Sequence, residues 1–138
     1  MSLSELIESG FNKEHDYNCA ESILYGANQV YDLGLDKNAL KMAAGFGGGV
    51  GIEAICGALT GGVMVLGRMF TEDRAHASPR VKELTIELIE RFRREMGEID
   101  CTPLKERYRT EELGCRNVIL KGAQVLERII REEQQRRR

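Results

Sequence analysis

Residues Ala43 to Phe70 read AAGFGGGVGIEAICGALTGGVMVLGRMF, and the rest of the chain is organised around this stretch. Its first part carries five glycines in the seven residues 45–51, which is too many for a regular helix or strand. Its second part is apolar for long enough to form a buried helix. The pattern predicts a tight glycine loop that leads into a core helix, beginning at about Gly51 or Ile52 and ending at Phe70. Cys56 falls in the first turns of this helix.

Two glycines of the predicted core helix, Gly57 and Gly61, are four residues apart and therefore share one face. Glycine inside a helix costs up to about 1 kcal/mol relative to alanine, so a close packing contact should offset that loss. The glycine face can serve a close helix–helix crossing, or it can form a binding groove. Both interpretations remain open at the level of the sequence.

The flanking sequence carries helix start and stop signals at regular intervals. Runs of strand-forming β-branched residues are few, and no strand–helix alternation occurs. We therefore predict a single all-α domain over residues 1–138, a bundle of five or six helices around the glycine-rich central helix. Besides the core helix, the expected helical segments are residues 2–8, 18–32, 37–44, 79–96, 102–108 and 115–133, with residues 11–16 as a polar connection.

Composition excludes several classes of function. The 138-residue chain has a net charge of −2, so it lacks the basic surface that nucleic-acid binding requires. The longest uncharged apolar stretch, residues 54–67, falls short of the roughly twenty residues that span a bilayer. The N-terminus has no basic region typical of a signal peptide. These features predict a cytoplasmic protein without nucleic-acid partners and without membrane insertion.

The four cysteines are Cys19, Cys56, Cys101 and Cys115. Structural disulfides are uncommon in the cytoplasm, so these thiols favour metal or redox chemistry. Three of them lie near predicted helix starts, and Cys101 lies just before one. The free N–H groups and partial positive charge of a helix start stabilise a thiolate, the form that binds metals and attacks disulfides.

The cysteine spacings of 37, 45 and 14 residues match no standard local motif. Without C-x-x-C, neither a zinc ribbon nor a thioredoxin-type motif is present, and without C-x-x-C-H, covalent haem is not expected. The glycine loop has Val50 where G-x-G-x-x-G needs its third glycine, so no nucleotide is expected. The simpler interpretation is that backbone amides near Gly47, Gly48, Gly49 and Gly57 pack around sulfur or a bound cofactor.

Two acidic residues lie close in sequence to cysteines. Glu21 follows Cys19 by two residues, and Glu53 precedes Cys56 by three. Either carboxylate could carry protons or support a ligand, although a solvated surface position is the commoner outcome for such residues.

Three segments together resemble a known family. They are Asn18-Cys19-Ala20-Glu21-Ser22, Ala44-Gly45-Phe46-Gly47-Gly48-Gly49 and Cys56-Gly57-Ala58-Leu59-Thr60-Gly61, and two later cysteines follow them. This order resembles the C-GCAxxG-C-C family of redox-active proteins, which is related to the non-haem part of split-Soret cytochromes. The resemblance implies a small helical protein whose four family cysteines correspond to Cys19, Cys56, Cys101 and Cys115. It also implies an association with an iron–sulfur centre, but it brings no haem and no substrate.

Three functional hypotheses follow. The first is an electron-transfer or sensing protein whose four cysteines bind an iron–sulfur cluster of the 2Fe–2S type and which meets a redox partner. The second is a metal-free thiol–disulfide protein, with Cys101 paired to Cys115 and Cys19 to Cys56. The third is a structural zinc protein or a helical interaction protein that dimerises through the glycine face. A homodimer is expected, no catalytic residue is predicted, and the sequence does not decide whether the protein is an enzyme.

Overall fold

Local sequence signals set most helix boundaries in the computed structural model, which describes residues 1–138. Ser2 and Asn18 each form a capping box with the glutamate three residues on, at the starts of the first and third helices. The predicted segment 79–96 stops at Gly97, which adopts a left-handed conformation with φ of 84°. These signals lie at the predicted starts of segments 2–8 and 18–32 and at the predicted end of segment 79–96, so those boundaries are confirmed.

The chain forms eight α-helices and no strands, so the predicted all-α fold is confirmed. Two of the eight have only four residues each, and one of these lies within residues 11–16, where only a connection was predicted. The structure contains no helix long and apolar enough to cross a bilayer. The helices are α1 (Leu3–Glu8), α2 (Phe11–Glu14), α3 (Cys19–Tyr31), α4 (Lys37–Leu40), α5 (Gly57–Phe70), α6 (Pro79–Met96), α7 (Cys101–Tyr108) and α8 (Arg116–Arg136).

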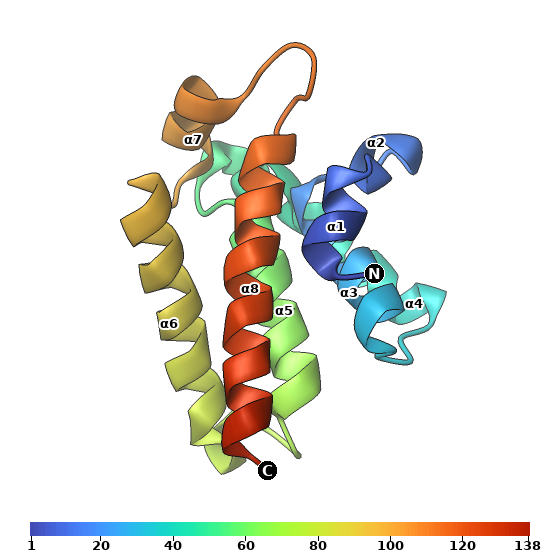
Figure 1. The fold of residues 1–138 in the computed structure, drawn as a ribbon, viewed down its shortest axis with the longest axis vertical. Coiled ribbons are helices and arrows are strands. Elements are labelled where there is room, and N and C mark those ends of the chain that lie inside the picture. The colour runs from blue at the N-terminus through green and yellow to red at the C-terminus, as the bar shows by residue number, and fades with distance from the viewer.

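Helices α5, α6 and α8 run side by side along the long axis of the molecule, and α1 to α4 pack beside them (Figure 1). Helix α7 lies across the end of the molecule at which α8 begins (Figure 1). The buried apolar side chains form one continuous cluster that draws on α1, α3, α5, α6 and α8. This cluster holds the start of α5 near the starts of α3 and α8.

The glycine face of α5 packs against α3 of the same chain. A Cβ atom at Gly61 would lie 2.8 Å from the carbonyl oxygen of Ala20, so only glycine permits this crossing. A Cβ atom at Gly57 would likewise lie close to α3, at 3.0 Å from the backbone nitrogen of Ala20. The face is therefore a helix–helix contact. Its predicted use for dimerisation is wrong, and the homodimer stays a prediction.

The core helix begins at Gly57, not at Gly51 or Ile52 as predicted. The residues before it turn the opposite way, because Gly48, Gly49, Val50 and Gly51 have φ between 62° and 76°. Such angles belong to left-handed backbone and cannot continue a right-handed helix. Val50 is β-branched, so its position in this turn is strained. The apolar residues before Gly57 predict a longer helix, because hydrophobicity alone does not distinguish a helix from buried irregular chain.

Candidate functional site

Each of the four cysteines lies at the N-terminus of a different helix. Cys56 and Cys115 occupy the N-cap positions of α5 and α8, and Cys19 and Cys101 are the first residues of α3 and α7. The placement near helix starts predicted for three thiols therefore extends to all four. The positive ends of four helix dipoles thus meet at one place.

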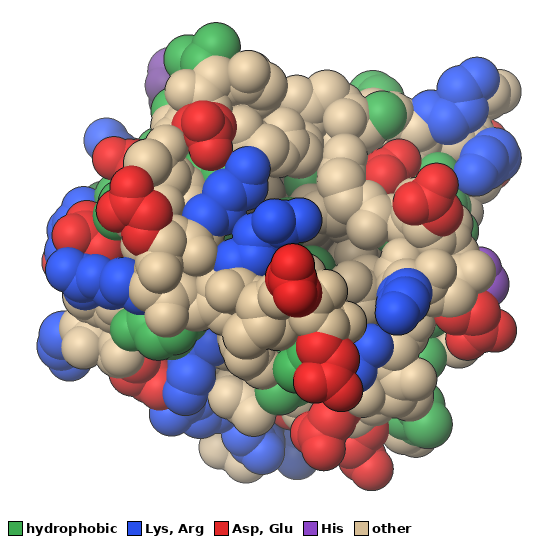
Figure 2. Space-filling model, turned by 90° about the horizontal axis from the view of Figure 1, so that it is seen from above, with side chains coloured by type: hydrophobic (Ala, Val, Ile, Leu, Met, Phe, Trp, Pro, Cys, Tyr) green, Lys and Arg blue, Asp and Glu red, His purple; other side chains and the backbone are tan.

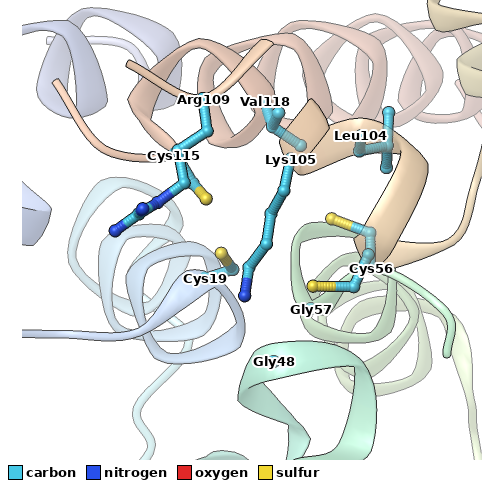
Figure 3. A pocket seen from close by; sticks show the side chains of 10 residues that line it. Cys19, Gly48, Cys56, Gly57, Leu104, Lys105, Arg109, Cys115 and Val118 are labelled. Atoms are coloured by element: carbon cyan, nitrogen blue, oxygen red, sulfur yellow. The ribbon is translucent and has the colours of Figure 1, made fainter. Parts of the chain in front are cut away.

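The four side chains line one cavity of about 210 Å³, and Figure 3 shows Cys19, Cys56 and Cys115 around its opening. Cys19 and Cys115 are 96 residues apart in the sequence, and the packing of α3, α5 and α8 brings them to the same cavity. All four thiols are free. The structure therefore brings together every cysteine that the sequence singled out.

Cys56 and Cys101 are held beside each other by backbone pairing. The Cys56 amide donates to the carbonyl oxygen of Ile99 at 2.8 Å, and the Cys101 amide donates to that of Ala54 at 2.7 Å. These bonds flank an antiparallel bridge between Ile55 and Asp100. Because side chains alternate along extended chain, Cys56 and Cys101 project to the same side of the bridge. Both are almost completely buried, at 4% and 8% exposed.

Cys19 and Cys115 form the opposite side of the cavity, and both are only half-buried. The two residues lie beside each other on this side of the cavity (Figure 3). The thiols therefore form two pairs, one buried and one partly open to solvent. This pairing differs from the disulfide pairs expected from the sequence, which were Cys101 with Cys115 and Cys19 with Cys56.

Two cations also line the cavity. Lys105 lies across the opening, and Arg109 lies beside Cys115 (Figure 3). The Lys105 ammonium nitrogen is 3.2 Å from a carboxylate oxygen of Glu53, so an ion pair joins α7 to the left-handed turn. From outside, Lys and Arg side chains border a hollow in the face of the molecule that is seen from above (Figure 2).

The sequence singled out the four cysteines but not these two cations. A signal was nevertheless present, because Cys101, Lys105 and Arg109 are four residues apart, the spacing of one helix face. Leu104 and Val118 complete the apolar part of the lining. Their place in the cavity depends on how α7 packs, which the pattern within one helix does not specify.

Two of the four predicted cofactor-binding glycines, Gly48 and Gly57, line the cavity. The other two face elsewhere. Gly47 packs against the side chain of Asn18, and Gly49 packs against the backbone of Ala54. Among the acids, Glu53 stands near the opening through its ion pair with Lys105.

Glu21 has a structural role at the start of α3. Its carboxylate accepts a hydrogen bond from the backbone N–H of Asn18 at 2.9 Å, as part of the capping box. The cap places Cys19 at the first helical position, where its thiol reaches the cavity.

The buried thiols have raised pKa values. Burial raises the pKa of Cys56 to about 11, and the nearby backbone amides of Ala58 and Leu59 only partly offset this rise. Burial likewise raises the pKa of Cys101. The Cys56 side chain accepts no capping hydrogen bond at the start of α5, so the N–H···S bonds expected around the glycine loop stay a prediction.

The half-buried pair behaves asymmetrically. The adjacent Cys115 sulfur raises the pKa of Cys19, with burial and the other thiols acting in the same direction. The adjacent Cys19 thiol, together with Arg109 and Lys105, lowers the pKa of Cys115. One thiolate is therefore favoured at Cys115, and its charge disfavours ionisation of the rest. A bound metal centre would reverse this balance and displace the remaining protons.

The donor geometry distinguishes between kinds of metal centre. No three histidine, cysteine or acidic side chains stand close enough together to hold a single metal ion. A tetrahedral zinc site needs four donors around one ion, so the arrangement does not form one. Two pairs of thiols on opposite sides of a cavity suit a larger group that takes ligands at two ends, as a two-iron cluster with four cysteine ligands does.

Comparison with known proteins gives one match. The family described as "Putative redox-active protein (C_GCAxxG_C_C)" matches residues 17–129. The chain belongs to this family. The matched range covers all four cysteines, the glycine loop and α7 with its two cations, so the resemblance seen in the sequence is confirmed. No curated protein and no solved structure matches the chain.

Proposed function

We propose that this redox protein binds one iron–sulfur cluster of the 2Fe–2S type through Cys19, Cys56, Cys101 and Cys115, and that it transfers or senses single electrons. The observation that carries the proposal is the convergence of four thiols, each at a helix N-terminus, as two pairs around one cavity. When bound, such a cluster supplies a one-electron couple whose potential depends on hydrogen bonds, charge and solvent exposure.

The protein would hold the cluster between its two pairs of thiols. Cys56 and Cys101 would hold the buried end. Cys19 and Cys115 would hold the end that reaches solvent, where electron exchange with a redox partner is least hindered. The positive helix ends favour the negatively charged, thiolate-ligated centre over four neutral thiols.

The test is chemical analysis of protein purified and reconstituted without oxygen. We expect iron and acid-labile sulfide in equal amounts, with visible absorbance, and we expect Cys56→Ser to lose both. Thr60→Ser is the matched control, because it changes the same helix and can keep the hydroxyl contact to the Gly57 carbonyl. Wild-type protein without iron and sulfide, or Cys56→Ser with undiminished iron content, would contradict the proposal.

A second candidate rests on the contact between Cys19 and Cys115. In a metal-free protein these two thiols could form a disulfide, giving up two electrons and two protons to an oxidant such as a small-molecule disulfide. The test is mass spectrometry after mild oxidation of metal-free protein. A Cys19–Cys115 bridge would support this candidate, and four unchanged thiols would exclude it.

A further inference from the structure

The two sides of the four-cysteine cavity differ in their surroundings. On one side, Cys56 and Cys101 are buried, and the apolar Leu104 lines the cavity with them. On the other side, Cys19 and Cys115 are half-buried, and Arg109 lines the cavity beside Cys115 (Figure 3). A full positive charge and nearby solvent stabilise added negative charge more than burial among apolar groups does.

The two cations of the cavity are not equivalent. Lys105 is paired with Glu53 at 3.2 Å, so much of its charge is compensated within the protein. Arg107, on the same helix, is paired with Glu98 at 3.4 Å and does not line the cavity. Arg109 lies just beyond the end of α7 and lines the cavity beside Cys115 (Figure 3). Of these three cations, Arg109 thus acts most directly on a thiolate.

We propose that Arg109 sets the reduction potential of the four-cysteine site, acting from the side formed by Cys19 and Cys115. The inference rests on the proposed function, since it concerns the charge of a cluster held by these thiolates. Reduction adds one electron from an external one-electron donor, breaks no bond, and makes the centre more negative by one charge. Arg109 stabilises that added charge and so favours the reduced state.

The test compares three variants after anaerobic reconstitution. Arg109→Gln removes the charge at the cavity, Arg109→Lys keeps it, and Arg107→Gln removes an equal charge from the same helix outside the cavity. The midpoint potential is measured by titration with dithionite, followed by the visible and electron paramagnetic resonance spectra. Iron and sulfide content of each variant shows whether the cluster is present at the same level.

We expect reduction of Arg109→Gln to be about fivefold less favourable than that of the wild type, which is a shift of about 40 mV to more negative potential for a one-electron couple. Arg109→Lys and Arg107→Gln should stay close to the wild type. Raising the salt concentration should shrink the Arg109→Gln shift, because Arg109 is exposed and its charge is screened.

Two results would overturn the inference, and they can be distinguished. Equal potentials for Arg109→Gln and Arg107→Gln, with full iron and sulfide, would overturn the role of Arg109 and leave the proposed function standing. Wild-type protein that takes up no iron and sulfide would overturn the proposed function, and this inference with it.

Discussion

The bundle of α5, α6 and α8 and the cysteine end of the molecule are built on different principles. The bundle consists of long right-handed helices whose buried faces carry mainly large apolar side chains, with glycine and alanine on α5 and α8. The cysteine end has a four-residue left-handed turn, an isolated backbone bridge and charged side chains around a cavity. The region that stabilises the fold and the region that carries the thiols therefore lie at different places along the long axis. Helix α5 connects them.

The separation has a physical reason. A redox site needs polar groups, solvent contact and unusual backbone, all of which reduce the apolar area that can be buried. Val50 illustrates this, because it is strained in the left-handed region and is also 48% exposed. The bundle supplies the burial that the cysteine end lacks, and it holds the starts of α5 and α8 in place.

The largest expected effect tests the bundle. Leu126 of α8 is fully buried, so Leu126→Ala should lower the free energy of unfolding by about 2–5 kcal/mol. The measurement is urea denaturation followed by circular dichroism. Ile86→Ala is the control, since Ile86 is 53% exposed on α6 and its truncation should change stability by less than about 0.5 kcal/mol. Equal losses in the two variants would mean that the bundle is not the stabilising half.

The next prediction tests the cysteine end with one substitution at two glycines. A Cβ at Gly49 would lie 2.4 Å from the Ala54 nitrogen, whereas Gly51 has open space. Both have positive φ, so Gly51→Ala should cost about 1–2 kcal/mol from backbone strain alone. Gly49→Ala adds a clash with Ala54, whose carbonyl oxygen accepts the hydrogen bond from the Cys101 amide. This variant should therefore lose more stability than Gly51→Ala.

The readouts for these two variants are urea denaturation and iron content after reconstitution. We expect Gly49→Ala to lose iron binding, because it displaces the segment that aligns Cys101 with Cys56. Gly51→Ala should retain iron. If both variants bind as much iron as the wild type, the left-handed turn is not needed to shape the cavity.

The smallest expected effect concerns the ionic link between α6 and α8. Burial raises the pKa of Glu133, but hydrogen bonds from Arg80 and Arg137 outweigh it and lower the pKa below its usual range. The stabilising contribution is therefore fully present above the unfolded-state pKa of about 4.3, and it is lost as pH falls through the lower folded pKa. Glu133→Gln should lower the free energy of unfolding by about 1 kcal/mol at pH 7. The free energy of unfolding of this variant should also fall less steeply than that of the wild type as the pH is lowered.

Stability measured from pH 7 down to about pH 3 checks this last prediction. Glu83→Gln is the matched control, because Glu83 pairs with the same Arg80 but is 62% exposed, and exposed pairs contribute little. A Glu133→Gln profile that runs parallel to the wild type would contradict the proposed link.

Several features could be predicted because they depend on residues close in sequence. The boxes at Ser2 and Asn18, the stop at Gly97 and the amphipathic pattern of α6 are local signals, and all were confirmed. The family could be identified because its cysteines and glycines keep a characteristic order. The helical class follows from the same local preferences.

Other features depend on contacts between distant segments. The start of α5 was placed too early because an apolar run gives no sign of the left-handed turn before Gly57. The pairs expected from the sequence were Cys101 with Cys115, which are close along the chain, and Cys19 with Cys56, which both lie near the glycine loop. In the structure Cys19 lies beside Cys115 (Figure 3), because the packing of α3 and α8 brings their N-terminal ends together.

By itself, the sequence determined that the chain is helical, where most helices begin and end, and that four thiols lie near helix starts. Those properties arise from interactions within a few residues, which the order of residues specifies directly. Only the tertiary structure decided that the four helix starts converge, which thiols pair, and that Arg109 stands beside Cys115. These follow from the packing of glycine and apolar faces, because burial of the whole core sets where each helix end lies.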